Sequence, residues 1–295
     1  MNVFVTGCAS HLAKTLLPLL CNDERIDKVT GIDRKPCQFK HQKFVFHQAD
    51  IRDDKLSAWM TRHDALIHLA FIVLRGKMPI EEMHDVNVTA SFKVFQQAKN
   101  CGIPRFIHLS SASVYGQGSN LDEKTPFSPI PGFIYAAHKA ELEIKLHQHF
   151  PNILCLRPHI ILGPEALPLL RFILKQPFYV KLKGPQPLLQ CVHEKDVAHA
   201  ILLSVFSSIS GALNLASDES LSFREMININ RPGAIGIPLS LVKPILKLVW
   251  QLTGLGGEPA WLDGAEHSLT LNCLRAQNEL DWKPEFSSLQ AIKSL

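Results

Sequence analysis

The sequence predicts an α/β fold in which helices cover both faces of a mostly parallel, doubly wound sheet, with a smaller part formed by the C-terminal half. Two observations carry this prediction. Short apolar strands alternate with helical segments as far as about residue 163, a rhythm typical of parallel sheets. The first strand also runs straight into a glycine-containing turn and an apolar helix, the arrangement that cradles phosphate groups in dinucleotide-binding folds.

The composition is that of a globular protein and excludes several other classes. The chain has 295 residues, of which 46% are hydrophobic and 20% charged, enough for one large domain or two smaller ones. The net charge of +4 comes from scattered residues, so no nucleic-acid partner is expected. No apolar run reaches membrane-spanning length. The histidines show no HExxH-like spacing, and no metal site is expected.

Cysteine usage indicates a reducing compartment. The chain has seven cysteines, an odd number, without a CxxC spacing. Its N-terminus enters directly with a strand and shows no secretory signal pattern. We therefore expect reduced thiols and a cytoplasmic location.

The opening turn follows an apolar strand over residues 3–6 and leads into a helix rich in leucine. Its pattern is Gly7-x-x-Ser10-x-x-Ala13, in which the last two residues replace glycines of the phosphate-binding fingerprint. Alanine at a helix–sheet packing position is a mild change. Ser10 could donate a hydrogen bond to a phosphate, or its Cβ could crowd that group. The alternative is an ordinary strand, turn and helix without a ligand.

The second strand ends at Asp33, followed by Arg34 and Lys35. A carboxylate at this place can accept hydrogen bonds from ribose hydroxyls and repels a 2′-phosphate, which favours NAD. The two neighbouring cations could accommodate that phosphate instead, which leaves NADP as the alternative. They could also be solvated turn charges.

A helix is predicted around Tyr135-Ala136-Ala137-His138-Lys139, because good helix formers surround it. The spacing of four places Tyr135 and Lys139 on one face, about one turn apart. A free tyrosine is a poor base at neutral pH, and a nearby cation is expected to lower its pKa towards working range. By itself this spacing also fits a surface pair.

Three motifs together resemble the extended short-chain dehydrogenase/reductase superfamily, in its NAD-dependent epimerase/dehydratase branch. They are the Val3–Ala13 turn, the stretch from Ile107 to Gly116, and the tyrosine–lysine helix, in that order and spacing. The resemblance covers nearly the whole chain. It implies a Rossmann-type fold, NAD as cofactor, a small-molecule substrate and hydride transfer at a hydroxyl or carbonyl carbon.

The resemblance also implies roles for individual residues. Tyr135 would be the general acid/base, Lys139 would favour the phenolate and bind the nicotinamide ribose, and Ser111 would position the substrate oxygen. Asn87 would be a hydrogen bonder near the site or simply a polar helix residue, and Asp50 would lie near adenine or cap a helix. Glu143, one turn beyond Lys139, fits the family pattern or only extends a charged helix face. The implied cofactor contacts are Gly7, Ser10, His11, Leu12, Asp33, Arg34, Asp50, Ile51, Leu69, Ala70, Asn87, Tyr135, Lys139 and Pro158.

One departure from the family pattern bears on the substrate. Enzymes of nucleotide sugars usually carry asparagine three positions after the arginine of the stretch beginning at Arg157, where this chain has Ile160. The pattern leaves two questions open: whether the substrate is sugar-like or less polar, and whether the enzyme is an epimerase or a dehydrogenase. The rival from another class is a dinucleotide-binding sensor or assembly protein with little catalysis, motivated by Ser10. The intact Ser111, Tyr135 and Lys139 argue against it.

The β/α rhythm divides the chain into two interleaved parts. A dinucleotide-binding domain is expected over residues 1–163, with 190–216 returning to it, and a substrate-binding part over 164–189 and 217–295. The apolar stretch 237–252 is expected to be core of the second part or a lid, rather than a dimer or membrane-surface contact, with Pro244 kinking it or starting a new helix. A homodimer through the helices after the fourth and fifth strands is implied by resemblance.

Overall fold

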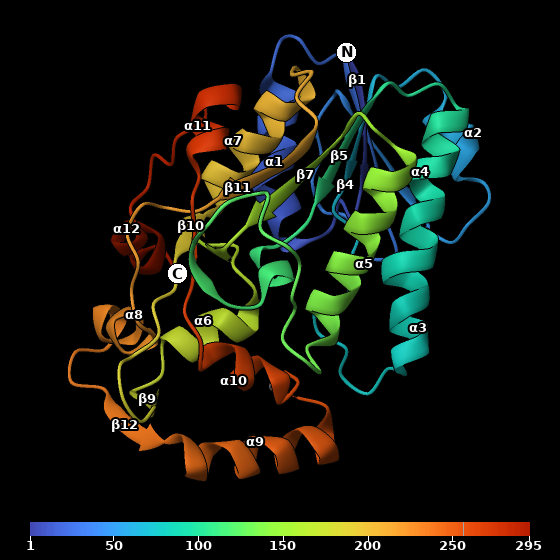
Figure 1. The fold of residues 1–295 in the computed structure, drawn as a ribbon. Coiled ribbons are helices and arrows are strands. Elements are labelled where there is room, and N and C mark those ends of the chain that lie inside the picture. The colour runs from blue at the N-terminus through green and yellow to red at the C-terminus, as the bar shows by residue number, and fades with distance from the viewer. Residues whose placement is uncertain (256) are drawn as a thin grey trace.

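A seven-stranded, fully parallel sheet forms the centre of the computed structural model, which describes residues 1–255 and 257–295 (Figure 1). The direction of strand order reverses between β1 and β4, as in a doubly wound fold, which confirms the predicted class. Across the sheet the strands are β11 (Gly211–Leu215), β7 (Ile153–Pro158), β5 (Arg105–Leu109), β4 (Ala65–His68), β1 (Asn2–Thr6), β2 (Lys28–Asp33) and β3 (Phe44–Gln48).

Helices cover both faces of this sheet (Figure 1). The helical stretch over residues 80–100 contains a π-helical turn, Asp85–Ala90, between two α-helical parts. One face carries α1 (His11–Asn22), α7 (Glu194–Val205) and α11 (Leu274–Leu280), and the other carries α2 (Leu56–Met60), α3 (Ile80–His84), α4 (Ser91–Asn100) and α5 (Ile134–His149).

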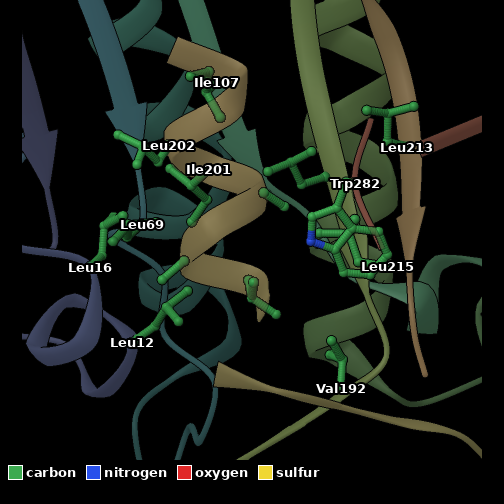
Figure 2. Close-up of a cluster of buried hydrophobic side chains, with 14 of the residues drawn as sticks. Leu12, Leu16, Leu69, Ile107, Val192, Ile201, Leu202, Leu213, Leu215 and Trp282 are labelled. Carbon is green, nitrogen blue, oxygen red and sulfur yellow. The ribbon is translucent and has the colours of Figure 1, made fainter. Parts of the chain in front are cut away.

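Two apolar cores form because successive strand residues point to opposite faces of the sheet. In β1, Val3 and Val5 join the core under α1 and α7, whereas Phe4 joins the core under α4 and α5. Figure 2 shows the first core, where Ile201 of α7 lies among side chains of α1, the strands and the C-terminal segment. Burial on both faces explains why these strands read as continuous apolar runs.

Smaller elements gather at the carboxyl ends of the strands (Figure 1). Short parallel pairs join β8 (Ile160–Leu162) to β10 (Cys191–His193), β9 (Phe178–Lys181) to β12 (Ile235–Pro238), and β6 (Gly118–Leu121) to β13 (Leu269–Leu271). The remaining α-helices are α6 (Pro168–Leu174), α8 (Phe223–Asn230), α9 (Leu239–Thr253), α10 (Ala260–Ala265) and α12 (Ser288–Lys293), and a 3₁₀ helix covers Ala112–Tyr115. All seven cysteines are free thiols.

Helix α9 corrects the prediction for residues 237–252. None of its residues is buried, so it is not core, and none lines the cavity described below. Pro244 lies inside the helix and does not start a new one. In the described part of the chain, no helix combines the length and apolar character needed to cross a membrane.

Candidate active site

A cavity of about 360 Å³ opens at the carboxyl ends of the central strands. Its floor comes from the ends of β4, β5 and β7, and its far walls come from α6, α8 and α10. Open α/β sheets bind ligands at this edge, next to the point where the strand order reverses. The cavity brings together the following predicted residues: Ser10, His11, Leu12, Leu69, Ser111, Tyr135, Lys139 and Pro158.

The opening turn has the geometry of a phosphate cradle. Gly7 has φ of +74°, and a Cβ there would lie 2.5 Å from the backbone nitrogen of Ala70, so only glycine fits. Ser10 stands at the N-terminus of α1, where free backbone N–H groups favour an anion. Its Oγ is buried and has no hydrogen-bond partner among the described residues. A buried unpaired hydroxyl beside a helix N-terminus fits the pyrophosphate of a dinucleotide.

The end of β2 holds this turn in place. Asp33 accepts two backbone hydrogen bonds. Its Oδ2 accepts from the backbone nitrogen of Ala9 at 3.0 Å, and its Oδ1 accepts from the backbone nitrogen of Lys35 at 2.9 Å. Arg34 lies 3.5 Å from the carboxylate of Asp50. Thus Asp33 supports the turn and retains lone pairs for ribose hydroxyls.

Asp50 and its neighbour belong to the adenine end of the predicted site. The Asp50 carboxylate pairs with Arg52 at 2.8 Å, and hydrogen bonds from Arg52 hold the pKa of Asp50 below its usual range. Ile51 is 8% exposed and joins the core under α4. Asp50, Ile51 and Arg34 do not line the cavity itself.

Tyr135 occupies the first turn of α5, facing the end of β5. Burial raises the pKa of Tyr135 to about 12, and a hydrogen bond with Ser111 acts in the opposite direction. The Ser111 Oγ also accepts hydrogen bonds from the Oγ of Ser113 at 2.9 Å and from its backbone nitrogen at 3.2 Å. A tyrosine and a serine that share a hydrogen bond at the cavity wall can hold one substrate oxygen between them.

Lys139 lies one turn further along α5 and is 3% exposed. Its Nζ donates a hydrogen bond to the carbonyl oxygen of Leu109 and stands 3.6 Å from the ring centroid of Phe71. Burial lowers the pKa of Lys139 to about 7, against the opposing charge of Glu143. The expected lowering of the Tyr135 pKa by Lys139 is not found in this arrangement: burial raises that pKa, and the Lys139 Nζ lies 5.9 Å from the centroid of the phenol ring.

Two other predicted contacts lie behind the cavity wall. Asn87 is fully buried and forms two hydrogen bonds with the backbone of Ile72, at 2.7 and 3.0 Å. It therefore fixes the loop after β4 rather than reaching the cavity. Ala70 lies next to Gly7, where strand ends meet the turn. Both residues support the groups that line the site.

The outer walls consist of apolar side chains that no sequence motif singled out. They come from the loop after β4, from the segment before α5 and from the C-terminal elements, and their only sequence signal was apolar character in those segments. They include Val73, Phe133, Leu170, Phe223 and Trp261. Among the described lining residues, Lys139 is the only lysine or arginine. The cavity lining is thus mostly apolar, with Ser111, Tyr135 and Lys139 as a polar group at the strand ends.

Comparison with known proteins agrees with this geometry. The profile of the NAD dependent epimerase/dehydratase family matches residues 3–207. The chain is 24% identical to UDP-glucose 4-epimerase of Halalkalibacterium halodurans, covering 99% of this chain and 93% of that protein. It is 21% identical to sterol-4-alpha-carboxylate 3-dehydrogenase, decarboxylating, of Dictyostelium discoideum, over 100% and 99% of the two chains.

The fold also matches known structures. MoeE5 in complex with UDP-glucuronic acid and NAD superposes with a TM-score of 0.79 at 20% identity, covering 100% of this chain and 97% of that one. This likeness concerns the fold, and the family match concerns the sequence. The chain therefore belongs to the NAD-dependent epimerase/dehydratase family of extended short-chain dehydrogenases/reductases and is an NAD-dependent enzyme.

Proposed function

We propose that this enzyme is a dehydrogenase or reductase of a largely apolar secondary alcohol or ketone. The observation that carries the proposal is the contrast within one cavity. Ser111, Tyr135 and Lys139 line it at the strand ends, and aromatic and aliphatic side chains form most of the remaining lining. A nucleotide sugar carries a diphosphate, which needs cations or several donors, and Lys139 alone among the described lining residues supplies a positive charge.

In this proposal each polar residue has a separate task. Tyr135 donates its proton to the substrate oxygen during reduction and removes it during oxidation. Ser111 donates a hydrogen bond to the same oxygen and fixes its position. Lys139 binds the ribose next to the nicotinamide. When bound, NAD supplies the hydride acceptor or donor.

The phosphate turn completes the cofactor site. The unpaired Oγ of Ser10 donates to the pyrophosphate, and Asp33 accepts from the ribose hydroxyls. Because Asp33 repels a 2′-phosphate, NAD is preferred and NADP remains the alternative. Gly7 keeps the backbone close enough for this contact.

Two observations favour an apolar substrate over the sugar nucleotides handled by some relatives. Ile160, which lines the cavity, replaces an amide by a hydrocarbon side chain. One full-length relative is named as a dehydrogenase of a sterol carboxylate. A second candidate, an epimerase of nucleotide sugars, is supported by the printed name of another relative.

A substrate panel separates these candidates. The purified enzyme with NADH is offered apolar cyclic ketones, and with NAD⁺ it is offered the matching alcohols. In parallel, UDP-glucose is offered and product sugars are analysed. We expect consumption of NADH with the apolar ketones and no epimerised sugar. Epimerisation of UDP-glucose together with inert ketones would overturn the proposal in favour of the epimerase.

Three further proposals concern organisation. We place the dinucleotide-binding domain at residues 1–163 with 190–216, and the substrate-binding part at 164–189 with 217–295. The homodimer is proposed to pair the surfaces of α4 and α5, and light scattering of the purified protein tests it. A cytoplasmic location is proposed on the seven free thiols.

A further inference from the structure

The outward face of α9 is a stripe of large apolar side chains. Leu241, Ile245, Leu248 and Leu252 are 58%, 60%, 57% and 65% exposed. Their spacing of three or four residues places them on one side of the helix. Single exposed leucines are normal on protein surfaces, but a continuous row marks a contact surface. The term α9 stripe is used below for these four residues.

Exposed apolar residues also lie just before and just after α9 in the sequence. Leu255, just after α9, is 68% exposed. Ile235 on β12, the strand that runs directly into α9, is 71% exposed, and its register partner on β9, Phe178, is 43% exposed. Figure 1 shows α9, β9 and β12 together at one end of the molecule, opposite the N-terminus. The stripe is therefore part of a broader apolar end.

The opposite side of α9 is firmly attached to the enzyme. Lys243 forms ion pairs with Asp263 at 2.5 Å and Glu266 at 3.3 Å, both at α10. The guanidinium of Arg75 lies over the ring of Trp250 at 4.9 Å. These contacts fix the orientation of the helix. The outward direction of the α9 stripe is therefore set by contacts with the rest of the protein.

The segments around the stripe carry only positive charge. Residues 166–193 and 226–257 contain no aspartate or glutamate. Five of their basic residues are exposed and form no ion pair within the described ranges, namely Lys175, Lys181, Lys183, Arg231 and Lys247. Lys181 pairs in register with Pro238, directly before α9. The basic residues of the two segments are Arg171, Lys175, Lys181, Lys183, Arg231, Lys243 and Lys247.

We propose that this end of the molecule docks on the surface of an anionic phospholipid bilayer. The α9 stripe would lie below the headgroups, and the exposed lysines would contact lipid phosphates and carboxylates. An amphipathic helix with leucines on one side and lysines at its border is the usual element for such binding. A second copy of the chain fits less well, because a two-fold contact would bring the same basic segments face to face.

Docking would place the cavity next to the bilayer. The α10 helix that binds Lys243 also supplies Trp261 to the cavity wall. An apolar alcohol or ketone dissolved in the membrane would then be concentrated near the cavity. This last consequence rests on the proposed function, whereas lipid binding itself does not.

The test measures lipid binding without substrate. Full-length protein is sedimented with phosphatidylcholine vesicles that either contain or lack phosphatidylserine, at low and high salt. We expect binding to the anionic vesicles that weakens as salt rises. The double variant Leu248→Glu/Leu252→Glu should lose roughly tenfold or more in vesicle affinity. Lys181→Glu/Lys183→Glu should weaken binding and flatten its salt dependence.

The matched control is Leu274→Glu/Leu289→Glu on α11 and α12, where the two leucines are 56% and 41% exposed. It should bind vesicles like the unchanged protein, and thermal unfolding should show that all variants are folded. Absence of vesicle binding by the unchanged protein would overturn the proposal, as would equal binding by the stripe variant. A dimer in solution that only the stripe variant converts to monomer, without lipid binding, would assign the surface to a second copy instead.

Discussion

Arg157 on β7 and Glu143 on α5 form a fully buried ion pair beneath the predicted site. Both Nε and Nη2 of Arg157 donate to Oε1 of Glu143, at 2.9 and 2.6 Å, and Ser110 donates to Oε2. Arg157 also donates to the hydroxyl of Tyr115, which in turn donates to Asn214 on β11 at 2.8 Å. The network ties the helix that carries Tyr135 and Lys139 to two strands of the sheet.

This pair predicts a large loss of stability when one partner is removed. Glu143→Leu would leave the guanidinium of Arg157 buried without its counter-charge, and we expect a loss of about 3–5 kcal/mol in the free energy of unfolding. Urea unfolding measures this quantity. The control is Glu141→Gln on the same helix, because Glu141 forms half-exposed ion pairs worth less than about 1 kcal/mol. Equal effects of the two changes would contradict the structural role of the buried pair.

Ser10 yields a prediction about cofactor binding. If its buried Oγ donates to the pyrophosphate, Ser10→Ala should weaken NAD binding by roughly tenfold, the value of one hydrogen bond to a charged group. Calorimetric titration with NAD⁺ and NADH measures the change. Ser57→Ala, at an exposed serine on α2, is the control. Tighter binding by Ser10→Ala would show that the side chain crowds the phosphate instead.

Buried histidines predict acid sensitivity. His68 is fully buried between Thr6 and Ser91, and burial lowers its pKa from 6.5 to about 3. Between these values the unfolded chain binds a proton that the folded chain does not, so stability is lost as pH falls below 6.5. His159, with a pKa lowered by burial to about 4, acts in the same direction.

The expected slope is about 1.4 kcal/mol per pH unit for each such histidine. Urea unfolding at a series of pH values between 7 and 4 measures it. A His68→Gln variant should show a shallower slope, whatever its overall stability. The control is Gln148→Ala, a change at an exposed residue of α5 that carries no titrating group, and it should leave the slope unchanged. A pH-independent free energy of unfolding over this range would contradict the burial argument.

Much of the fold could be predicted because it depends on local pattern. Strands buried on both faces read as short apolar runs, and the glycine turn after β1 follows from Gly7 alone. The strands and the turn needed only the order of elements. The convergence of Ser111 with Tyr135 was implied by the family resemblance, and both residues line the cavity.

The remaining features depend on partners that are distant in sequence. Glu143 could have extended a charged helix face, and only the fold places Arg157 against it. Asn87, on the π-helical turn, accepts a hydrogen bond from the backbone nitrogen of Ile72 and does not reach the cavity. Apolar periodicity identified α9 as a helix, but periodicity does not reveal whether an apolar face meets the protein core or the outside.

The central claim is that Tyr135 transfers the proton in a mostly apolar cavity. The most direct measurement is kcat for NADH-dependent reduction of an apolar ketone that the enzyme accepts, in Tyr135→Phe and in the control Tyr179→Phe. We predict a loss of at least about 100-fold for Tyr135→Phe, with unchanged NADH affinity, and near-normal turnover for the control. Full activity of Tyr135→Phe would contradict the account.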